Sequence, residues 1–538
     1  MKWQSKEQML DLLCSLVEIP SVTNSGAELT LVEYLYYQLI DESYFKGNPD
    51  HLQLHPLEDG RHLLTALVKN NPNKETIVLL SHFDVVGVED YGSWKNLAFH
   101  PKSLTQELLH FKEVLPSQAR EDLESGNWLF GRGTMDMKAG LTIHLSILER
   151  AMNGEFDGNI LLLTVPDEEV NSLGMLTALP ALKSIAEKEK LNLRACINGE
   201  PMFSQYPGDH HYYLYTGSIG KVLPGFYCYG KETHVGEPFA GMNANLMISY
   251  LSQYIELSEN FVEENYGEKT PPPVSLMQRD LKEEYSVQTP VGAVAMYNMF
   301  YMQQSLQDLT NKLLEAANQA SLEITKHYHS KVKAFHQNEK GLEAPKMNIK
   351  VLSYEELYKE TIKRHGETEV KRRLSLLQSH RNHGDRDFST LLVQELSHLC
   401  KDLAPMIVLF YSPPFYPAVH SGEDQWIQDI VSETKINARK MGNYPLEEIH
   451  YFPGLSDLSF IGPSLVEGGY RCLTENMPLY GRGFKLPENI TEMLTMPILN
   501  IGPLGRDPHQ WTERLEVNYS FEVVPDLLAK TLKYMFGN

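Results

Sequence analysis

Short apolar runs alternate, along the first part of the chain, with segments whose apolar residues recur every three or four positions. Residues 76–80 and 159–165 are continuous apolar runs, which are typical of buried parallel strands. Residues 6–18 and 26–41 have the three- and four-residue spacing, which predicts amphipathic helices. This alternation continues to about residue 205 and predicts an α/β fold with a doubly wound, mainly parallel sheet.

The pattern changes at about residue 217, where a glycine-rich stretch leads into a region of different character. Residues 303–336 predict one long amphipathic helix, and residues 354–380 predict charged helical segments. A helical pattern from about Asp424 returns the chain to the first type of alternation. We therefore predict a first domain that is split by an inserted α+β domain, bounded as 1–216 (first part), 217–422 (inserted) and 423–538 (second part).

Composition narrows the class of protein. The chain has 538 residues, 42% of them hydrophobic, which is enough for a large core and more than one domain. Its formal net charge of -22 disfavours nucleic acid and anionic membranes as partners. The sequence shows no apolar run of transmembrane length and no signal-peptide core, so a cytoplasmic location is expected. The five cysteines are scattered and indicate neither a disulfide framework nor a cysteine-ligated zinc site.

Acidic and imidazole side chains follow the predicted strands. Such positions converge, because ligands of open α/β sheets lie outside the carboxyl ends of the strands. One further carboxylate lies in a glycine-bounded turn, in the sequence GRGTMDMKAG at 131–140. We expect these groups to form a metal site, and they are His82, Asp84, Asp136, Glu168, Glu169 and Glu200.

Each of these signals has an ordinary explanation when taken alone. A histidine two residues before an aspartate is often structural, and the adjacent Glu168 and Glu169 could simply begin a helix. The combination favours two divalent ions, which need a bridging carboxylate and further carboxylate or imidazole ligands. One more carboxylate must stay off the metals to carry a proton. These ligand types suit zinc, with cobalt or manganese as possible substitutes.

The motifs together resemble those of a known enzyme family. They are SHFDVV at 81–86, GRGTMDMK at 131–138, PDEE at 166–169, GEP at 199–201, GLSD at 454–457 and GPLGRDPH at 502–509 followed by Glu513. The chain is identified as a member of the dinuclear-zinc amidohydrolases that include aminoacylase, carboxypeptidase G, acetylornithine deacetylase and succinyl-diaminopimelate desuccinylase. Its length and long insertion resemble the RocB-like arginine-utilisation branch. A helical insertion at about 101–124 is not typical of the family.

The resemblance implies a role for each matched residue. One zinc would be held by His82, Asp136 and Glu200, and the other by Asp136, Glu169 and His509. Glu168 would be the general base, and Asp84 would accept a hydrogen bond from the second ring nitrogen of His82. His234, in THVG at 233–236, resembles the lid histidine that stabilises an oxyanion. The resemblance also implies that the split first domain is the catalytic domain, that the inserted domain is an enlarged lid, and that the peptide bond after Asp136 is cis.

Substrate contacts from the inserted domain are expected from Asn243, His383 and Arg386, although a charged run such as 379–387 is usually only solvated surface. The enlarged insertion could replace a neighbouring subunit's lid, so a monomer is favoured and a homodimer stays possible. The predicted function is zinc-dependent hydrolysis of amide bonds in small N-acyl amino acids or short peptides, and the resemblance alone implies a role in arginine or related amino-acid catabolism. The alternatives are a dipeptidase or aminopeptidase, and a catalytically silent binding relative.

Overall fold

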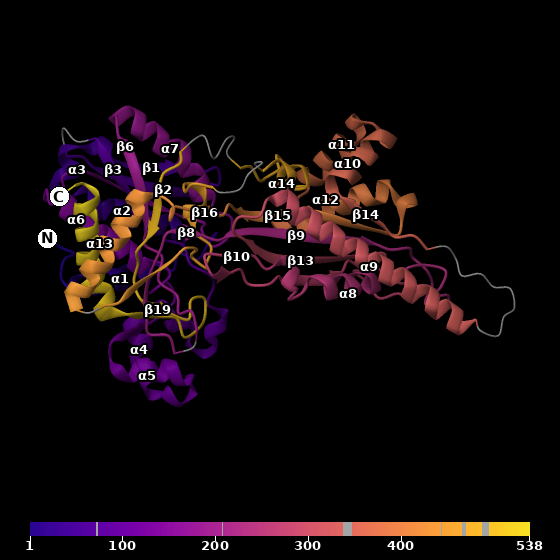
Figure 1. Cartoon of the computed structure of the whole chain (residues 1–538), viewed down its shortest axis with the longest axis horizontal. Coiled ribbons are helices and arrows are strands. Elements are labelled where there is room, and N and C mark those ends of the chain that lie inside the picture. Colours follow the sequence, from indigo (N-terminus) through magenta and orange to yellow (C-terminus); the bar gives the residue numbers. More distant parts are fainter. Residues whose placement is uncertain are drawn as a thin grey trace. The chain divides into compact units, whose positions relative to one another are not determined.

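The structure is a computed structural model that describes residues 1–70, 74–206, 208–336, 347–442, 444–464, 470–486 and 494–537. The chain forms two compact units. Unit 1 comprises Met1–Ile219, Val419–Ser464 and Pro487–Asn538, and unit 2 comprises Gly220–Ala418 and Leu465–Leu486. Figure 1 labels the elements of both units.

The segment Leu465–Leu486 differs from the predicted division, which placed it in the catalytic domain. Its helix α14 (Arg471–Glu475) packs on the long helix of unit 2. The Cys472 thiol donates to Thr310 Oγ1 at 3.3 Å, and the Asn476 carbonyl accepts the Tyr411 N–H at 2.8 Å. These contacts join segments far apart in the sequence, which no local pattern indicates.

An eight-stranded sheet forms the centre of unit 1, in the order β1-β2-β5-β3-β6-β18-β7-β17. β3 pairs in parallel with β5 and β6, β6 with β18, and β7 with β17, whereas the β1–β2, β2–β5 and β18–β7 pairs are antiparallel. The predicted mainly parallel sheet is thus confirmed. The strands are β1 (Leu52–Pro56), β2 (His62–Val68), β3 (Glu75–His82), β5 (Asn159–Val165), β6 (Asn192–Asn198), β7 (Tyr212–Tyr215), β17 (Leu446–Ile449) and β18 (Ile498–Asn500).

Helices cover both faces of this sheet (Figure 1). As a result, every residue of its central strand β5 is buried. The N-terminal helix begins with a capping box in which Ser5 Oγ accepts the Gln8 N–H. The described parts of the chain contain no helix with the length and apolar character needed to cross a membrane. The described α-helices of unit 1 outside its insertion are α1 (Lys6–Val17), α2 (Ala27–Ile40), α3 (Ser43–Gly47), α6 (Lys138–Met152), α7 (Leu173–Glu189), α13 (Gln425–Gly442) and α16 (Val524–Met535).

The insertion at about 101–124 is helical, as predicted, and has a small core of its own. It contains α4 (Pro101–His110) and α5 (Ser117–Ser125). It leads into β4 (Trp128–Phe130), the edge of a three-stranded sheet with β20 (Arg514–Glu516) and β19 (Gly505–Arg506). Its buried apolar side chains include Leu104, Leu108, Leu115, Leu123 and Phe130. The insertion is therefore more than a polar surface excursion.

Unit 2 is an α+β unit built on a five-stranded sheet in the order β12-β13-β9-β15-β14. Neighbouring residues of β15 point to opposite faces: the Tyr411 hydroxyl contacts Thr310 on α9 at 2.7 Å, and Ser412 Oγ contacts Ser389 on α12 at 3.3 Å. Helices thus lie on both faces here too. The elements are β9 (Gly220–Tyr229), α8 (Ala244–Ile255), β12 (Val274–Asp280), β13 (Gly292–Tyr301), α9 (Leu306–Phe335), β14 (Lys350–Ser353), α10 (Tyr354–His365), α11 (Glu367–Ser379), α12 (Asp385–Leu399) and β15 (Met406–Tyr416).

Candidate metal centre

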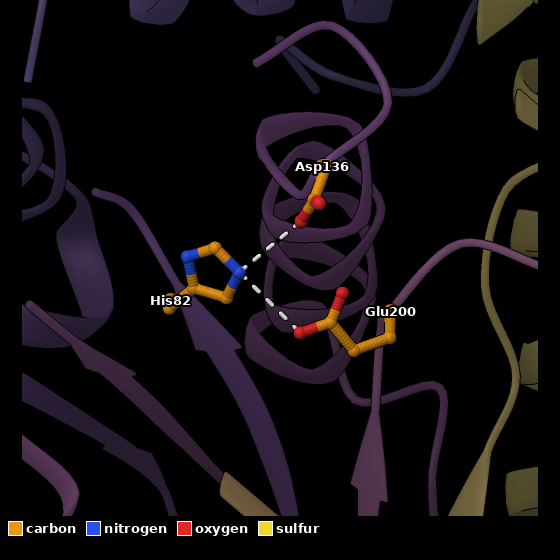
Figure 2. A group of neighbouring side chains, drawn as sticks. All are labelled: His82, Asp136 and Glu200. Carbon is orange, nitrogen blue, oxygen red and sulfur yellow. Dashed lines mark ion pairs between the residues drawn. The ribbon is translucent and has the colours of Figure 1, made fainter. Parts of the chain in front are cut away.

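Unit 1 brings the predicted acidic and imidazole residues together at one edge of its sheet. His82 is the last residue of β3, and Glu200 follows β6. Glu168 and Glu169 follow β5, and Asp136 precedes α6. Figure 2 shows the ring of His82 pointing between the carboxylates of Asp136 and Glu200.

His82 faces two carboxylates through one ring nitrogen. Its Nε2 lies 3.3 Å from Asp136 Oδ1 and 3.3 Å from Glu200 Oε1 (Figure 2). The side chain is only 1% exposed, and Nε2 is buried without a hydrogen bond to any described residue. A buried nitrogen aimed at carboxylate oxygens, with no hydrogen bond to them, is the arrangement expected of a metal ligand.

His509 faces a second pair of carboxylates. Its Nε2 lies 3.1 Å from Asp136 Oδ2 and 3.0 Å from Glu169 Oε1. The two oxygens of Asp136 therefore face different imidazoles, which is the geometry of a bridging carboxylate. Metal bonds of about 2.0–2.2 Å to nitrogen and oxygen place neighbouring ligand atoms about 3–3.5 Å apart, and the observed separations fit this range. Among the residues that the structure describes, the groups able to hold an ion are His82 with Asp136 and Glu200, His82 with Glu168 and Glu169, and Asp136 with Glu169 and His509.

Asp84 supports the centre from behind. Its Oδ1 lies 3.4 Å from His82 Nδ1, while its backbone carbonyl lies 3.1 Å from the same nitrogen. Its carboxylate also accepts the backbone N–H groups of Glu168 at 3.1 Å and Glu169 at 3.3 Å, and the Thr23 hydroxyl at 2.8 Å. Asp84 thus links the strand end that carries His82 to the turn that carries both glutamates.

The electrostatics of the centre favour bound cations. Burial raises the pKa of Glu168 well above its usual range, and it raises the pKa of Glu200 to about 7. Burial would lower the pKa of His509, but its contacts with Asp136 and Glu169 raise it to about 11. Burial acts in the opposite sense on Asp136, yet the neighbouring imidazoles of His509 and His82 lower its pKa. Crowded buried carboxylates of this kind are stabilised by positive charge among them.

Glycines allow the ligand-bearing segments to approach closely. A Cβ added to Gly140 on α6 would lie 2.0 Å from the Gly199 carbonyl oxygen. A Cβ added to Gly502 would lie 2.0 Å from the Glu200 carbonyl oxygen. The backbone at 199–200 is therefore confined between two glycines. The peptide bond between Asp136 and Met137 is cis, as predicted.

Three buried or half-buried residues beside the centre were not among the predicted site residues. Asp457 is 2% exposed, and burial raises its pKa to about 7. Arg132 pairs with Glu513 at 2.7 Å, which ties the Asp136 turn to the residue directly before β20. Arg61 pairs with Asp167 at 2.9 Å, one residue before Glu168. The GLSD and GRGT motifs pointed to the first two, whereas Arg61 lies in no motif.

The remaining predicted site residues belong to unit 2. His234 is exposed, and its Nδ1 accepts the Gly236 N–H at 3.0 Å. Asn243 caps α8 by accepting the Asn245 N–H at 2.9 Å. His383 lines a cavity of about 620 Å³, and Arg386 lies nearby on α12. Their predicted roles stay predictions.

Comparison with known proteins identifies the family of the chain. The model of the peptidase family M20/M25/M40 matches residues 78–461. The chain belongs to this peptidase family. It is therefore a hydrolase, as the sequence motifs predicted, and the family's reaction is the cleavage of amide bonds in peptides or acyl amino acids.

Two relatives of this M20 family chain match it over nearly their whole length. The uncharacterized protein YqjN of Bacillus subtilis is 53% identical over 99% of this chain and 97% of its own. Protein RocB of the same organism is 29% identical over 98% of this chain and 95% of its own. A tripeptidase from Staphylococcus aureus has a similar fold, with a TM-score of 0.56, 12% identity and full coverage of both chains. The predicted similarity to RocB is thus confirmed.

Proposed function

We propose that this chain is a dinuclear zinc hydrolase that cleaves amide bonds in small N-acyl amino acids or short peptides. The observation that carries the proposal is Asp136, whose two carboxylate oxygens face His82 and His509 separately. The first zinc would be held by His82, Asp136 and Glu200, and the second by Asp136, Glu169 and His509. Imidazole and carboxylate ligands suit zinc, with cobalt or manganese as substitutes.

When bound, the two ions would acidify a water molecule and polarise the carbonyl of the scissile amide. The chain's own residues do the remaining work. Glu168 is 5% exposed and has a raised pKa, so its carboxyl can take a proton and give it to the leaving nitrogen. Asp84 fixes the Glu168 backbone and the orientation of His82. His234 would stabilise negative charge on the carbonyl oxygen.

Two matched substitutions test the roles of the adjacent glutamates. Glu168→Gln should lower turnover by several orders of magnitude and leave two zinc ions per chain, because only the proton carrier is lost. Glu169→Gln should lose zinc, because a ligand is lost. Metal content by elemental analysis and turnover on an N-acyl amino acid or peptide substrate measure both. Equal zinc content with equal loss of activity in the two variants would refute the assignment.

A second part of the proposal concerns the substrate class. We infer a substrate from arginine or related amino-acid breakdown, and the near-full-length similarity to RocB supports this. A probable succinyl-diaminopimelate desuccinylase of Staphylococcus aureus, 26% identical over 52% of this chain, supports N-acyl substrates. Zinc-loaded protein should be screened against N-acyl amino acids, dipeptides and arginine-pathway intermediates. Turnover of dipeptides alone would favour the dipeptidase or aminopeptidase alternative, and turnover of none would favour a silent binding relative.

The other proposals concern partners and location. We expect a cytoplasmic monomer that binds small molecules and neither nucleic acid nor membrane. The net charge of -22 supports the exclusion of nucleic acid. Cell fractionation and light scattering test the location and the monomer.

A further inference from the structure

The loop that carries His509 differs from the other ligand-bearing segments. The His509 side chain is 47% exposed, whereas those of His82, Asp136, Glu169 and Glu200 are at most 10% exposed. Asp507 and His509 also have positive φ values of 56° and 61°, which non-glycine residues rarely adopt. Such a conformation persists only where surrounding contacts hold it. The position of His509 therefore depends on what holds the loop between β19 and β20.

A cluster of four charged side chains holds the start of this loop. Asp122, on α5 of the insertion, accepts two hydrogen bonds from Arg506 Nη1, at 2.6 and 2.8 Å. It also accepts one from Arg514 Nε at 2.7 Å. Arg514 in turn pairs with Asp507, two residues before His509. The Thr512 hydroxyl donates to the same Asp507 carboxylate at 2.7 Å.

Three of the four side chains are buried, and the two positive and two negative charges of the cluster balance. The side chains of Arg514, Arg506 and Asp122 are 0%, 10% and 11% exposed, respectively. The ring of Trp128 packs against both guanidinium groups, whose central carbons lie 4.8 and 5.5 Å from its centroid. Asp122 is thus the negative charge that holds both arginine side chains in place. Arg514, held in this way, in turn holds Asp507 through their ion pair.

Aromatic packing holds the other side of His509. Trp511, two residues after the histidine, stacks on Trp94 with ring centroids 5.6 Å apart and an interplanar angle of 13°. Trp94 also contacts Phe111, at the end of α4. The inserted helices and the segment before them therefore contact the loop on both sides of His509.

We propose that Asp122 is a positioning residue for His509, so that the insertion completes the second of the two metal sites. The inference rests on the proposed dinuclear function. Buried groups that orient ligands commonly contribute about 10–100-fold to metal affinity. Removing the Asp122 charge should weaken the ion held by Asp136, Glu169 and His509, and should leave the ion held by His82, Asp136 and Glu200 unchanged.

The test counts zinc directly. Full-length zinc-loaded protein is dialysed against a graded series of chelator concentrations, and the zinc retained per chain is measured. Asp122→Asn should release one ion at a chelator concentration about 10–100-fold lower than the native chain requires. The other ion should be released at the same chelator concentration as in the native chain. Glu124→Gln is the matched control, because Glu124 lies on the same helix and pairs only with exposed Lys112 among the described residues. It should behave as the native chain does.

Two further variants keep the outcome decisive. Asp507→Asn changes a side chain that is 31% exposed, so it tests the same path if Asp122→Asn does not fold. His509→Ala should lose the same single ion, and adding Asp122→Asn to it should cause no further loss. Release of both ions as in the native chain, or equal weakening of both, would overturn the inference and leave the proposed function intact. A native chain that retains no zinc would overturn both.

Discussion

His144 should make unit 1 sensitive to mild acid. It lies on α6 beneath the metal centre and is 0% exposed. Its Nδ1 lies 3.2 Å from Ser81 Oγ, and its Nε2 is buried without a hydrogen-bond partner in the described residues. Burial lowers the pKa of His144 from 6.5 to about 3, so the ring is neutral in the folded protein.

The direction and size of the effect follow from this pKa. Because the folded pKa is lowered, the unfolded chain takes up a proton below pH 6.5 that the folded chain does not. The stabilising contribution is complete above pH 6.5 and is lost as the pH falls toward 3. The free energy of unfolding falls by about 1.4 kcal/mol for each pH unit below 6.5, so the loss between pH 8 and pH 5 is about 2 kcal/mol.

The assay uses an intrinsic probe of unit 1. All five tryptophans belong to that unit, so their fluorescence in urea reports its unfolding, and they are Trp3, Trp94, Trp128, Trp426 and Trp511. His144→Asn removes the titrating ring and keeps an amide nitrogen near the position of Nδ1. The variant should be less stable than the native chain at pH 8. The difference should shrink by about 2 kcal/mol at pH 5.

The comparison is made on metal-free protein, so that release of metal at low pH does not contribute. His82 and His509 titrate in both proteins, and their effects cancel in the difference. If the stabilities of the two proteins fall in parallel between pH 8 and pH 5, His144 is not held neutral by burial and the reasoning is wrong.

The other predictions concern catalysis, assembly and backbone packing. His234→Ala should lower turnover about 10²–10³-fold with zinc content unchanged, and unchanged turnover would refute an oxyanion role. Light scattering should give the monomer mass of 61.4 kDa. Twice that mass, with activity restored on mixing His234→Ala and Glu168→Gln chains, would show a shared site instead. Gly140→Ala should destabilise unit 1 by about 1–3 kcal/mol or more and weaken zinc binding, whereas Gly47→Ala, with nothing within 4 Å, should do neither. Equal urea midpoints for the two glycine variants would contradict this.

The sequence predicted the site best where an acidic or imidazole side chain comes at or directly after the end of a strand. His82, Glu168 and Glu200 each come at or just after an apolar run, and the parallel strands bring them to one edge of the sheet. Asp136 was found because glycines mark its turn. Local patterns of this kind are sufficient because the sheet topology fixes where strand ends meet.

Contacts between distant segments could not be predicted in this way. The segment Leu465–Leu486 joins unit 2 through Cys472 and Asn476, neither of which belongs to a recognisable pattern. Asp122 similarly lies in a polar helix whose sequence resembles any solvated surface. Its partners come almost four hundred positions later in the chain, at Arg506 and Arg514. Only the folded chain shows that this helix contacts the two arginines at the ends of the loop that carries His509.

The glycine contacts at 140, 199 and 502 bear on how the centre would respond to ions of different ionic radius. Backbone atoms already in close contact cannot move toward each other, so the segments that carry Asp136 and Glu200 cannot come closer together. A smaller ion must then be accommodated by rotation of side chains or by the exposed loop of His509. Metal exchange should therefore alter the second site more than the first, and cobalt spectra of the two sites should differ in their sensitivity to loop variants.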